Sequence, residues 1–226
     1  DNASALNKAS KGHIKKILNR GDISGKSGQT LLLHDVPNIN AQRVLLVGAG
    51  NPETIDTQRY INICRSVINR LKTLSVKNVL CCLTDLDCGE HSAVWTTARL
   101  IEQFEGALYQ FTDMKGEGTS DTAAPEITKV ELYGPDRDAI EAMNLGITRG
   151  TALSLGLALA KDIANTPGNI CHPTYLAEQA IELGEKYTNL DVSVLEENDM
   201  EQLGMGAFLS VSRGSEQPGK LITMEY

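Results

Sequence analysis

The sequence predicts an α/β fold, in which a mixed sheet flanked by helices is followed by one long helix and then by the beginning of a second α/β unit. Up to about residue 136, short apolar runs alternate with stretches whose apolar residues recur every three or four positions. A proline-free stretch rich in Ala and Leu follows at 137–165, and the alternation then resumes. We therefore expect three parts, at residues 1–136, 137–166 and 167–226.

The composition is that of a globular protein and excludes several classes. Of the 226 residues, 41% are hydrophobic and 22% are charged, which excludes wholesale disorder and collagen. No run of about 18 apolar residues offers a transmembrane helix, and residues 1–16 lack the apolar core of a secretory signal. Five cysteines without regular spacing are typical of free thiols in a reducing compartment. We expect a cytoplasmic location and no membrane partner.

The first expected element is a helix at 3–20 that ends at Gly21, with its basic residues mostly opposite its apolar ones. These basic residues are Lys8, Lys11, Lys15, Lys16 and Arg20. A solvated helix face is the simpler interpretation, and a phosphate-contacting patch is the alternative. Residues 1–136 carry 15 basic and 16 acidic side chains, and residues 137–226 carry 6 and 13, so neither part favours polyanions as a whole.

The rest of the first part reads as strands separated by two helices. The helices are expected at about 56–74 and 90–106, each with an apolar stripe. Strands are expected at 30–33, 43–47, 78–83, 107–111 and 127–133. The last of these alternates polar and apolar residues, which suits an edge strand. The β-α-β-α-β order predicts a largely parallel sheet.

The stretch at 137–165 reads as a long helix whose apolar residues are spread over much of its circumference. Such a helix is typically buried between two bodies. Gly146, Gly150 and Gly156 each disfavour helix by about 1 kcal/mol relative to Ala, so we expect close packing at all three. Pro167 biases Thr166 away from the helical conformation and ends the helix.

The remaining residues begin a second α/β unit. Pro173 suits the first turn of a helix, and a strand is expected at 191–194. Asn198 and Glu201 have the spacing of a helix-capping pair. Two apolar segments follow, at 208–211 and 221–226.

Residues that could carry chemistry do not assemble into a catalytic site. Gly48-Ala49-Gly50 follows a strand, but Glu53 stands where a dinucleotide site needs a third Gly or Ala, so we interpret the glycines as a tight turn. Asp85, Asp87 and Glu90 form an acidic loop that reads more simply as solvated than as a cation site. The adjacent Cys171 and His172 cannot readily share one zinc ion. From these residues we assign no catalytic, cofactor-binding or metal-binding residue.

One family accounts for most of the chain. The passage from Ala160 resembles the pattern A-x-D-L-x-N-x-P-x-N-x-x-x-P-x-x-L-A of the leucyl (cytosol) aminopeptidase family, and other segments are similar to the same family. The matching segments are 160–171, 173–177, 201–211, 214–215 and 225–226, and more loosely 28–30 and 43–48.

The resemblance implies a macro-domain-like N-terminal part, a connecting helix and the start of a metallopeptidase domain. The family removes N-terminal residues, often leucine, from peptides with two divalent ions, zinc or manganese, and it assembles as hexamers. Its metal ligands and its catalytic lysine and arginine fall beyond Glu225-Tyr226, so we expect this segment to be non-catalytic, without a metal, and structural or oligomerising in role. Because some bacterial members bind DNA, the basic helix at 3–20 remains as the alternative. A nucleotide or ADP-ribose site is a weaker third reading.

Overall fold

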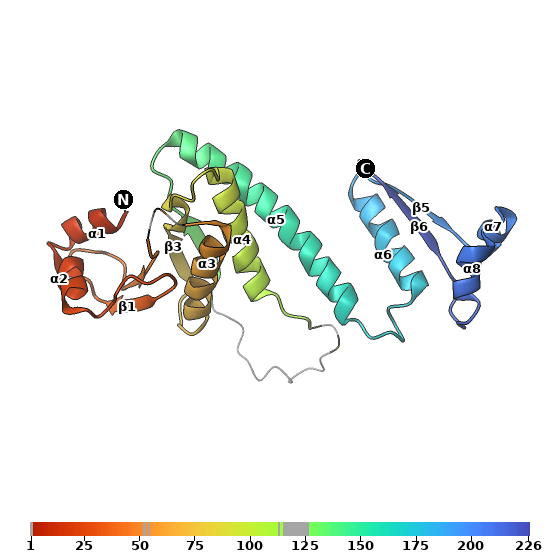
Figure 1. The fold of residues 1–226 in the computed structure, drawn as a ribbon, viewed down its shortest axis with the longest axis horizontal. Coiled ribbons are helices and arrows are strands. Elements are labelled where there is room, and N and C mark those ends of the chain that lie inside the picture. Colours follow the sequence, from red (N-terminus) through yellow and green to blue (C-terminus); the bar gives the residue numbers. More distant parts are fainter. Residues whose placement is uncertain (1, 52, 54, 113, 115–126) are drawn as a thin grey trace. The chain divides into compact units, whose positions relative to one another are not determined.

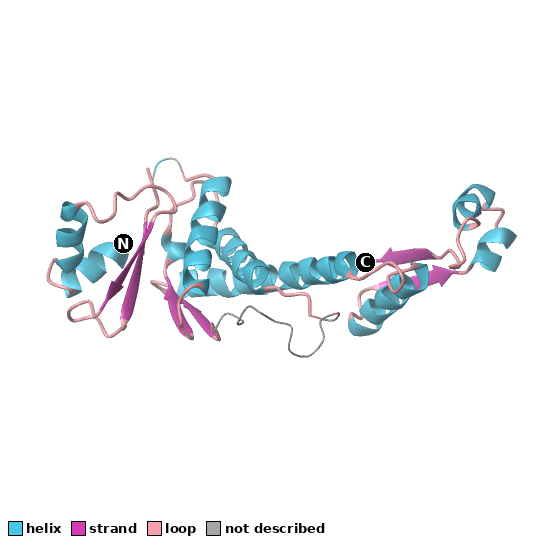
Figure 2. Ribbon diagram, turned by 90° about the horizontal axis from the view of Figure 1, so that it is seen from below, coloured by secondary structure: helices cyan, strands magenta, loops and turns pink. Residues whose placement is uncertain are grey.

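The computed structural model describes residues 2–51, 53, 55–112, 114 and 127–226, which form two compact units. Unit 1 comprises residues 1–110 and 115–158, and unit 2 comprises residues 111–114 and 159–226. Helices and strands are mixed in both units (Figures 1 and 2). The expected α/β class is therefore confirmed, and each unit is described here by itself.

The chain begins with two short helices, so the single helix expected at 3–20 is wrong. Helix α1 spans Asn2–Ala9 and α2 spans His13–Arg20. Lys11 and Gly12 between them have φ of 51° and 81°, and this left-handed backbone breaks the helix. The Asn7 side chain accepts a hydrogen bond from the Lys15 amide at 2.9 Å. Gly21, with φ of 80°, ends α2 as expected.

Strands β1 (Thr30–His34) and β2 (Arg43–Val47) form an antiparallel pair with Thr30 opposite Val47. Both strands were expected, but their direction differs from the largely parallel sheet. The link between them is too short for a parallel crossover, which needs about a dozen residues or more. Strands β3 (Asn78–Cys81) and β4 (Lys129–Leu132) are parallel. The described strands thus form two-stranded sheets of both kinds.

Helices α3 (Thr57–Lys72) and α4 (Ala93–Leu108) enclose the core of unit 1, and the short 3-10 helix η2 (Leu83–Asp85) follows β3. The apolar stripe expected on α3 is buried, and Tyr60 donates a hydrogen bond to the Thr96 carbonyl of α4 at 3.0 Å. The strand expected at 107–111 is absent, because α4 continues to Leu108 and the Tyr109 amide still bonds the Glu105 carbonyl at 2.9 Å.

Helix α5 spans Arg137–Asn165, as expected, and its small residues approach α4 closely. A Cβ at Gly146 would lie 2.6 Å from Thr97 Cβ, and one at Gly150 would lie 2.8 Å from the Ala98 carbonyl oxygen. The prediction of close packing is therefore confirmed at these two glycines. It is wrong at Gly156, where no atom of the described residues lies within 4 Å of the would-be Cβ.

Several leucines of α5 remain exposed, so the described residues cover only part of its apolar surface. The exposed large apolar residues of α5 are Ile140, Leu145, Ile147, Leu153, Leu155 and Leu157. The helix buries one line of residues spaced by three or four, from Met143 to Ser154. In unit 1, α5 therefore presents one packed side rather than the all-round burial expected from its composition.

Unit 2 contains α6 (Pro173–Lys186), β5 (Asp191–Leu195), α7 (Glu197–Gln202), α8 (Gly206–Ser212) and β6 (Leu221–Glu225). The strands pair antiparallel with Val192 opposite Met224, and α6 runs beside them (Figure 1). The cap of α7 is formed by Glu196 and Asp199 rather than by the expected Asn198 and Glu201. The apolar segment expected at 208–211 lies within the helix α8.

Candidate functional site

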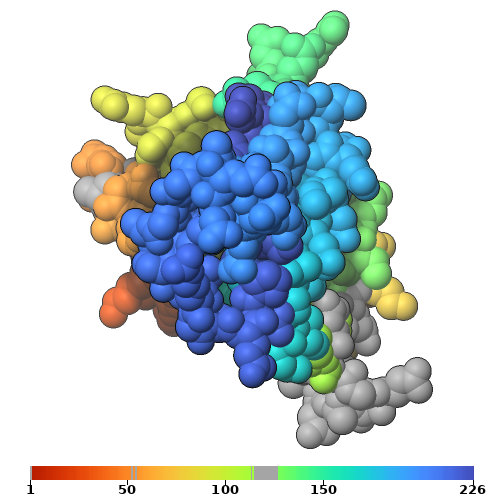
Figure 3. All heavy atoms as spheres, turned by 90° about the vertical axis from the view of Figure 1, so that its right-hand side faces the viewer, coloured from red at the N-terminus to blue at the C-terminus, as the bar shows by residue number. Residues whose placement is uncertain are grey.

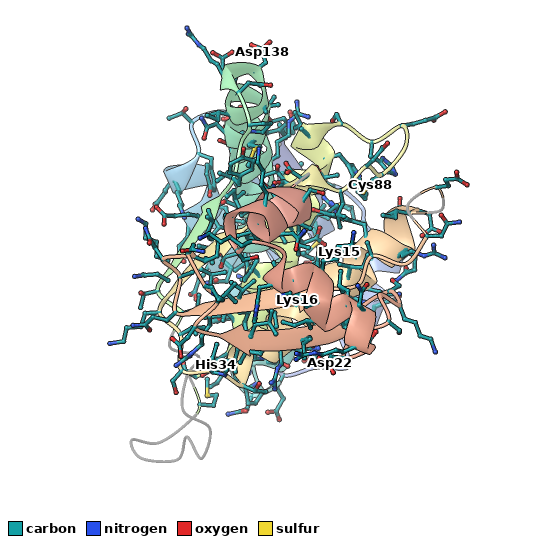
Figure 4. The ribbon with its side chains drawn as sticks, turned by 90° about the vertical axis from the view of Figure 1, so that its left-hand side faces the viewer. Lys15, Lys16, Asp22, His34, Cys88 and Asp138 are labelled. Atoms are coloured by element: carbon teal, nitrogen blue, oxygen red, sulfur yellow. The ribbon has the colours of Figure 1, made fainter. Side chains whose placement is uncertain are left out.

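The basic residues of α1 and α2 form an exposed surface, called here the basic patch. It consists of Lys8, Lys11, Lys15, Lys16 and Arg20, all exposed, whereas Ile14 and Ile17 of α2 are buried. Lys15 and Lys16 extend from α2 into solvent (Figure 4). Residues 2–21 contain no Asp or Glu. The patch is therefore locally cationic, although the break at Gly12 divides it between two helices.

The glycine turn after β2 is shaped by its own backbone contacts. A Cβ at Gly48 would lie 2.2 Å from the Lys26 carbonyl oxygen, and Gly50 has φ of 75°. Gly48 is thus required by the close approach of the segment around Gly25, and Gly50 by its left-handed conformation. This geometry supports the interpretation as a tight turn rather than as a phosphate-binding loop.

The amino ends of α3 and α4 are capped by their own side chains. Asp56 accepts a hydrogen bond from the Arg59 amide at 2.8 Å, and Ser92 accepts one from the Trp95 amide at 3.3 Å. A carboxylate at this helix end repels an incoming phosphate. The nucleotide interpretation therefore finds no support here.

A small aromatic cluster lies beside these caps. The His91 and Trp95 rings stack with centroids 3.8 Å apart, and His91 Nε2 lies 2.8 Å from Thr57 Oγ1. These contacts join the start of α4 to the start of α3. They bring together residues that the sequence analysis left unassigned, because their pairing spans 34 positions.

The acidic loop after η2 uses its carboxylates within the fold. Asp87 accepts a hydrogen bond from the Gly89 amide at 2.9 Å, and Asp85 accepts one from the Asn2 side chain. Across the part of the chain that the structure describes, no three or more His, Cys, Asp or Glu residues are arranged to hold a metal ion. Cys171 and His172 belong to no such group either.

Three cysteines of unit 1, called here the core thiols, are buried around Tyr60. Cys64, Cys81 and Cys88 are each at most 5% exposed. Burial raises the pKa of Cys64 to about 12 and raises the pKa of Cys81 and Cys88 to about 11. A thiol with so high a pKa holds almost no thiolate at neutral pH, so these side chains are packing groups rather than nucleophiles.

A polar network in unit 2 escaped the sequence analysis. Glu197 on α7 accepts hydrogen bonds from the Ser212 hydroxyl and the Gly219 amide, each at 2.8 Å. The Gly219 bond is the largest cause that lowers the pKa of the Glu197 carboxyl. The network fixes α8 and the turn before β6 to α7. Its partners lie 15 and 22 positions away, so local spacing carries no sign of it.

Two models of known protein families match the chain, one over its N-terminal part and one over its C-terminal part. The model of the cytosol aminopeptidase family, N-terminal domain, matches residues 1–118. The model of the cytosol aminopeptidase family, catalytic domain, matches residues 158–226. No helix among the described residues is long and apolar enough to span a membrane.

Individual relatives are similar over nearly the whole chain. A "Probable cytosol aminopeptidase" of Thioalkalivibrio sulfidiphilus is 43% identical over 99% of the chain, and one of Methylobacillus flagellatus is 39% identical over all of it. The chain spans 45% of the length of each relative.

Solved structures share the fold at lower sequence identity. A tomato leucine aminopeptidase mutant superposes with a TM-score of 0.74 at 20% sequence identity. The match covers 97% of this chain and 42% of the tomato enzyme's chain. The bottromycin maturation enzyme BotP in complex with Mn superposes with a TM-score of 0.73 at 19% sequence identity. That match covers 93% of this chain and 42% of the BotP chain.

Proposed function

Because the chain belongs to the cytosol aminopeptidase family, we propose that it supplies the non-catalytic part of an aminopeptidase that removes N-terminal residues, leucine among them, from peptides. The observation that carries this proposal is the match of both family domains in order along one chain. The relatives extend over more than twice the length matched here. The peptidase activity is thus proposed for the complete enzyme.

The proposed division of the chain is an N-terminal macro-like domain at 1–136, a connecting helix at 137–166 and the start of the peptidase domain at 167–226. The close fit of α5 against α4 supports a structural role for this helix, because it holds residues 137–158 firmly on unit 1. We propose that the segment shapes subunit contacts in a homo-oligomer, a hexamer, located in the cytoplasm. Light scattering of the purified chain tests the oligomer: a monomer at all concentrations contradicts it.

The complete enzyme is proposed to use two divalent ions, zinc or manganese, but the described residues do not fit them. No cluster of three ligand-type side chains is present among them, and the core thiols have raised pKa values. We therefore assign the metals, and every catalytic residue, to parts outside this segment. A BotP structure in complex with Mn is the observation that brings manganese into the proposal.

An amidase assay tests the non-catalytic assignment. The chain alone, given leucine p-nitroanilide with added Zn²⁺ or Mn²⁺, is expected to show no turnover above a protein-free blank. A fusion of the chain to the C-terminal portion of the Thioalkalivibrio sulfidiphilus relative provides the matched positive sample. Turnover by the chain alone contradicts the assignment.

Nucleic acid binding through the basic patch is the second candidate. It is favoured by five exposed cations in a stretch that contains no acidic residue. If the patch contacts phosphates, affinity for duplex DNA falls steeply with salt, and K15E/K16E reduces the slope by about 0.9 per lost contact. Lys77→Glu, an exposed lysine outside the patch, is the control. Equal binding by the two variants removes this candidate.

A further inference from the structure

Helix α6 of unit 2 carries carboxylates along one side. Glu178, Glu182 and Glu185 are spaced by four and three positions, so they share that side of the helix. All three are exposed, whereas Ala177 and Ala180 of the same helix are buried. Figure 3 shows the atoms of α6 (light blue) at the surface of unit 2. Because Glu side chains are almost never fully buried unless they are paired, this side of α6 is suited to a protein surface rather than to a core.

The side of α6 that carries these carboxylates borders a hollow between α6 and β5. The hollow has a volume of about 240 Å³. Ile181, Leu190 and Val192 give it apolar walls, and Glu185 and Asp191 add carboxylates to its lining. A lysine side chain matches this lining, because its stem packs on apolar groups while its ammonium group stays with polar ones. We call Glu178, Glu182, Glu185 and Asp191 the acidic face.

The acidic face carries more negative charge than its own unit balances. Asp191 stands directly opposite Glu225 in the pairing of β5 with β6, and both side chains are exposed. Like charges in this position destabilise a strand pair. Residues 159–226 carry 11 acidic and only 4 basic side chains. Among the ion pairs of the described residues, none involves the acidic face, so a cation from outside the unit would relieve the repulsion.

The basic patch of unit 1 has the complementary charge and a matching spacing. Lys16 and Arg20 lie four positions apart on α2, as Glu178 and Glu182 do on α6. Two helices with such pairs can place each cation beside one carboxylate. Lys15, which extends into solvent beside Lys16 in Figure 4, supplies a lysine for the hollow. No cation of the patch takes part in an ion pair within the described ranges.

We propose that the basic patch of one copy of the chain binds the acidic face of a second copy, and that these two surfaces form a subunit contact of the homo-oligomer. The proposal rests on the homo-oligomer of the proposed function and names the surfaces through which it assembles. A second copy is the chosen partner because one chain carries both complementary surfaces. A contact between two different surfaces leaves one of each kind available on every pair of copies, so it repeats until a ring closes.

Charge reversal of the basic patch tests the contact. In sedimentation velocity of nuclease-treated protein at about 50 mM NaCl, K16E/R20E is expected to raise the dissociation constant of the oligomer at least about tenfold. The reason is that each reversal replaces an attraction by a repulsion. K26E/K77E makes the same charge change on two exposed lysines of unit 1 outside the patch, and it is expected to associate as the unchanged chain does. Equal dissociation constants for the two variants overturn the proposal.

A mixture of variants distinguishes a contact between copies from a contact within one chain. E178K/E182K reverses charge on the acidic face and is expected to associate as poorly as K16E/R20E. When the two variants are mixed, opposite charges meet at both kinds of contact, so association is expected to return. Mixing cannot restore a contact that forms within one chain. A mixture that stays as dissociated as its components overturns the proposal.

The same measurements separate this contact from the proposed oligomer and from nucleic acid binding. An unchanged chain that is monomeric at all concentrations overturns the homo-oligomer and the contact together. An oligomer that persists unaltered in K16E/R20E and in E178K/E182K overturns the contact alone. If K16E/R20E loses affinity for duplex DNA but keeps its oligomer, the patch serves nucleic acid and the contact is overturned.

Discussion

Alanine substitutions at two glycines of α5 should change stability by clearly different amounts, because only one of the two glycines faces a close neighbour. At Gly150 a Cβ would lie 2.8 Å from the Ala98 carbonyl oxygen and 2.9 Å from Ile101 Cβ. The nearer neighbour is backbone of α4, so the two helices must separate. Overpacking of this kind costs about 1–3 kcal/mol, from which a helix-propensity gain of about 1 kcal/mol is subtracted.

Gly156→Ala is the matched control, because Gly156 lies in the same helix and no described part of the chain comes within 4 Å of its would-be Cβ. It gains the same propensity without the clash, so it should stabilise the chain by about 1 kcal/mol. The propensity gain cancels between the two variants. Gly150→Ala should therefore be less stable than Gly156→Ala by about 1–3 kcal/mol, the packing cost alone.

Urea unfolding followed by tryptophan fluorescence measures this difference. Trp95 is the single tryptophan of the chain and lies on α4, the helix that α5 packs against. In a thermal melt the same difference corresponds to about 2–4 °C for each kcal/mol in a chain of this size. Equal shifts of the same sign in the two variants refute the packing of α5 on α4 through Gly150.

Three further predictions concern groups that the fold places in special environments. Tyr60→Phe removes the buried hydrogen bond to the Thr96 carbonyl and should cost about 0.5–1.5 kcal/mol in urea unfolding, because that carbonyl lies within α4 and keeps its helical hydrogen bond. The core thiols should react with a thiol reagent at about pH 8 only as fast as the chain opens, whereas the partly exposed Cys171 should react directly. Mass spectrometry measures the rate at each cysteine, and equal rates contradict the burial of the core thiols. The hydrogen bonds of Glu197 lower the pKa of its carboxyl from 4.5. The stability that they contribute is therefore complete above pH 4.5 and is lost as the pH falls through the lowered pKa. An NMR titration that gives Glu197 a pKa of 4.5 or higher contradicts this prediction.

Local patterns in the sequence determined most helices and strands. The α3 stripe from Tyr60, the long helix at 137–165 and the strands at 30–33 and 43–47 follow from spacing that neighbouring residues create. The family followed from short motifs in the same way, because the segment around Ala160 is contiguous. Such features depend on side chains a few positions apart, which sequence displays directly.

The sequence predictions that were wrong concern local patterns that are compatible with two different backbone structures. The basic residues at 3–20 fit one helix, yet the left-handed backbone at Lys11 and Gly12 produces two. The segment 107–111 has strand-type residues, but α4 extends through its start because the Tyr109 amide still finds a helical acceptor. Asn198 and Glu201 have capping spacing, whereas Glu196 and Asp199 make the cap.

The sequence by itself determined the α/β class, the family and the long helix, because these depend on nearby residues. Only the tertiary structure decided which glycines of α5 face a neighbour and that Glu197 joins α7 to the turn before β6. Contacts of this kind join residues many positions apart. Their energies depend on how the elements pack, and packing is a property of the folded chain rather than of any short stretch of it.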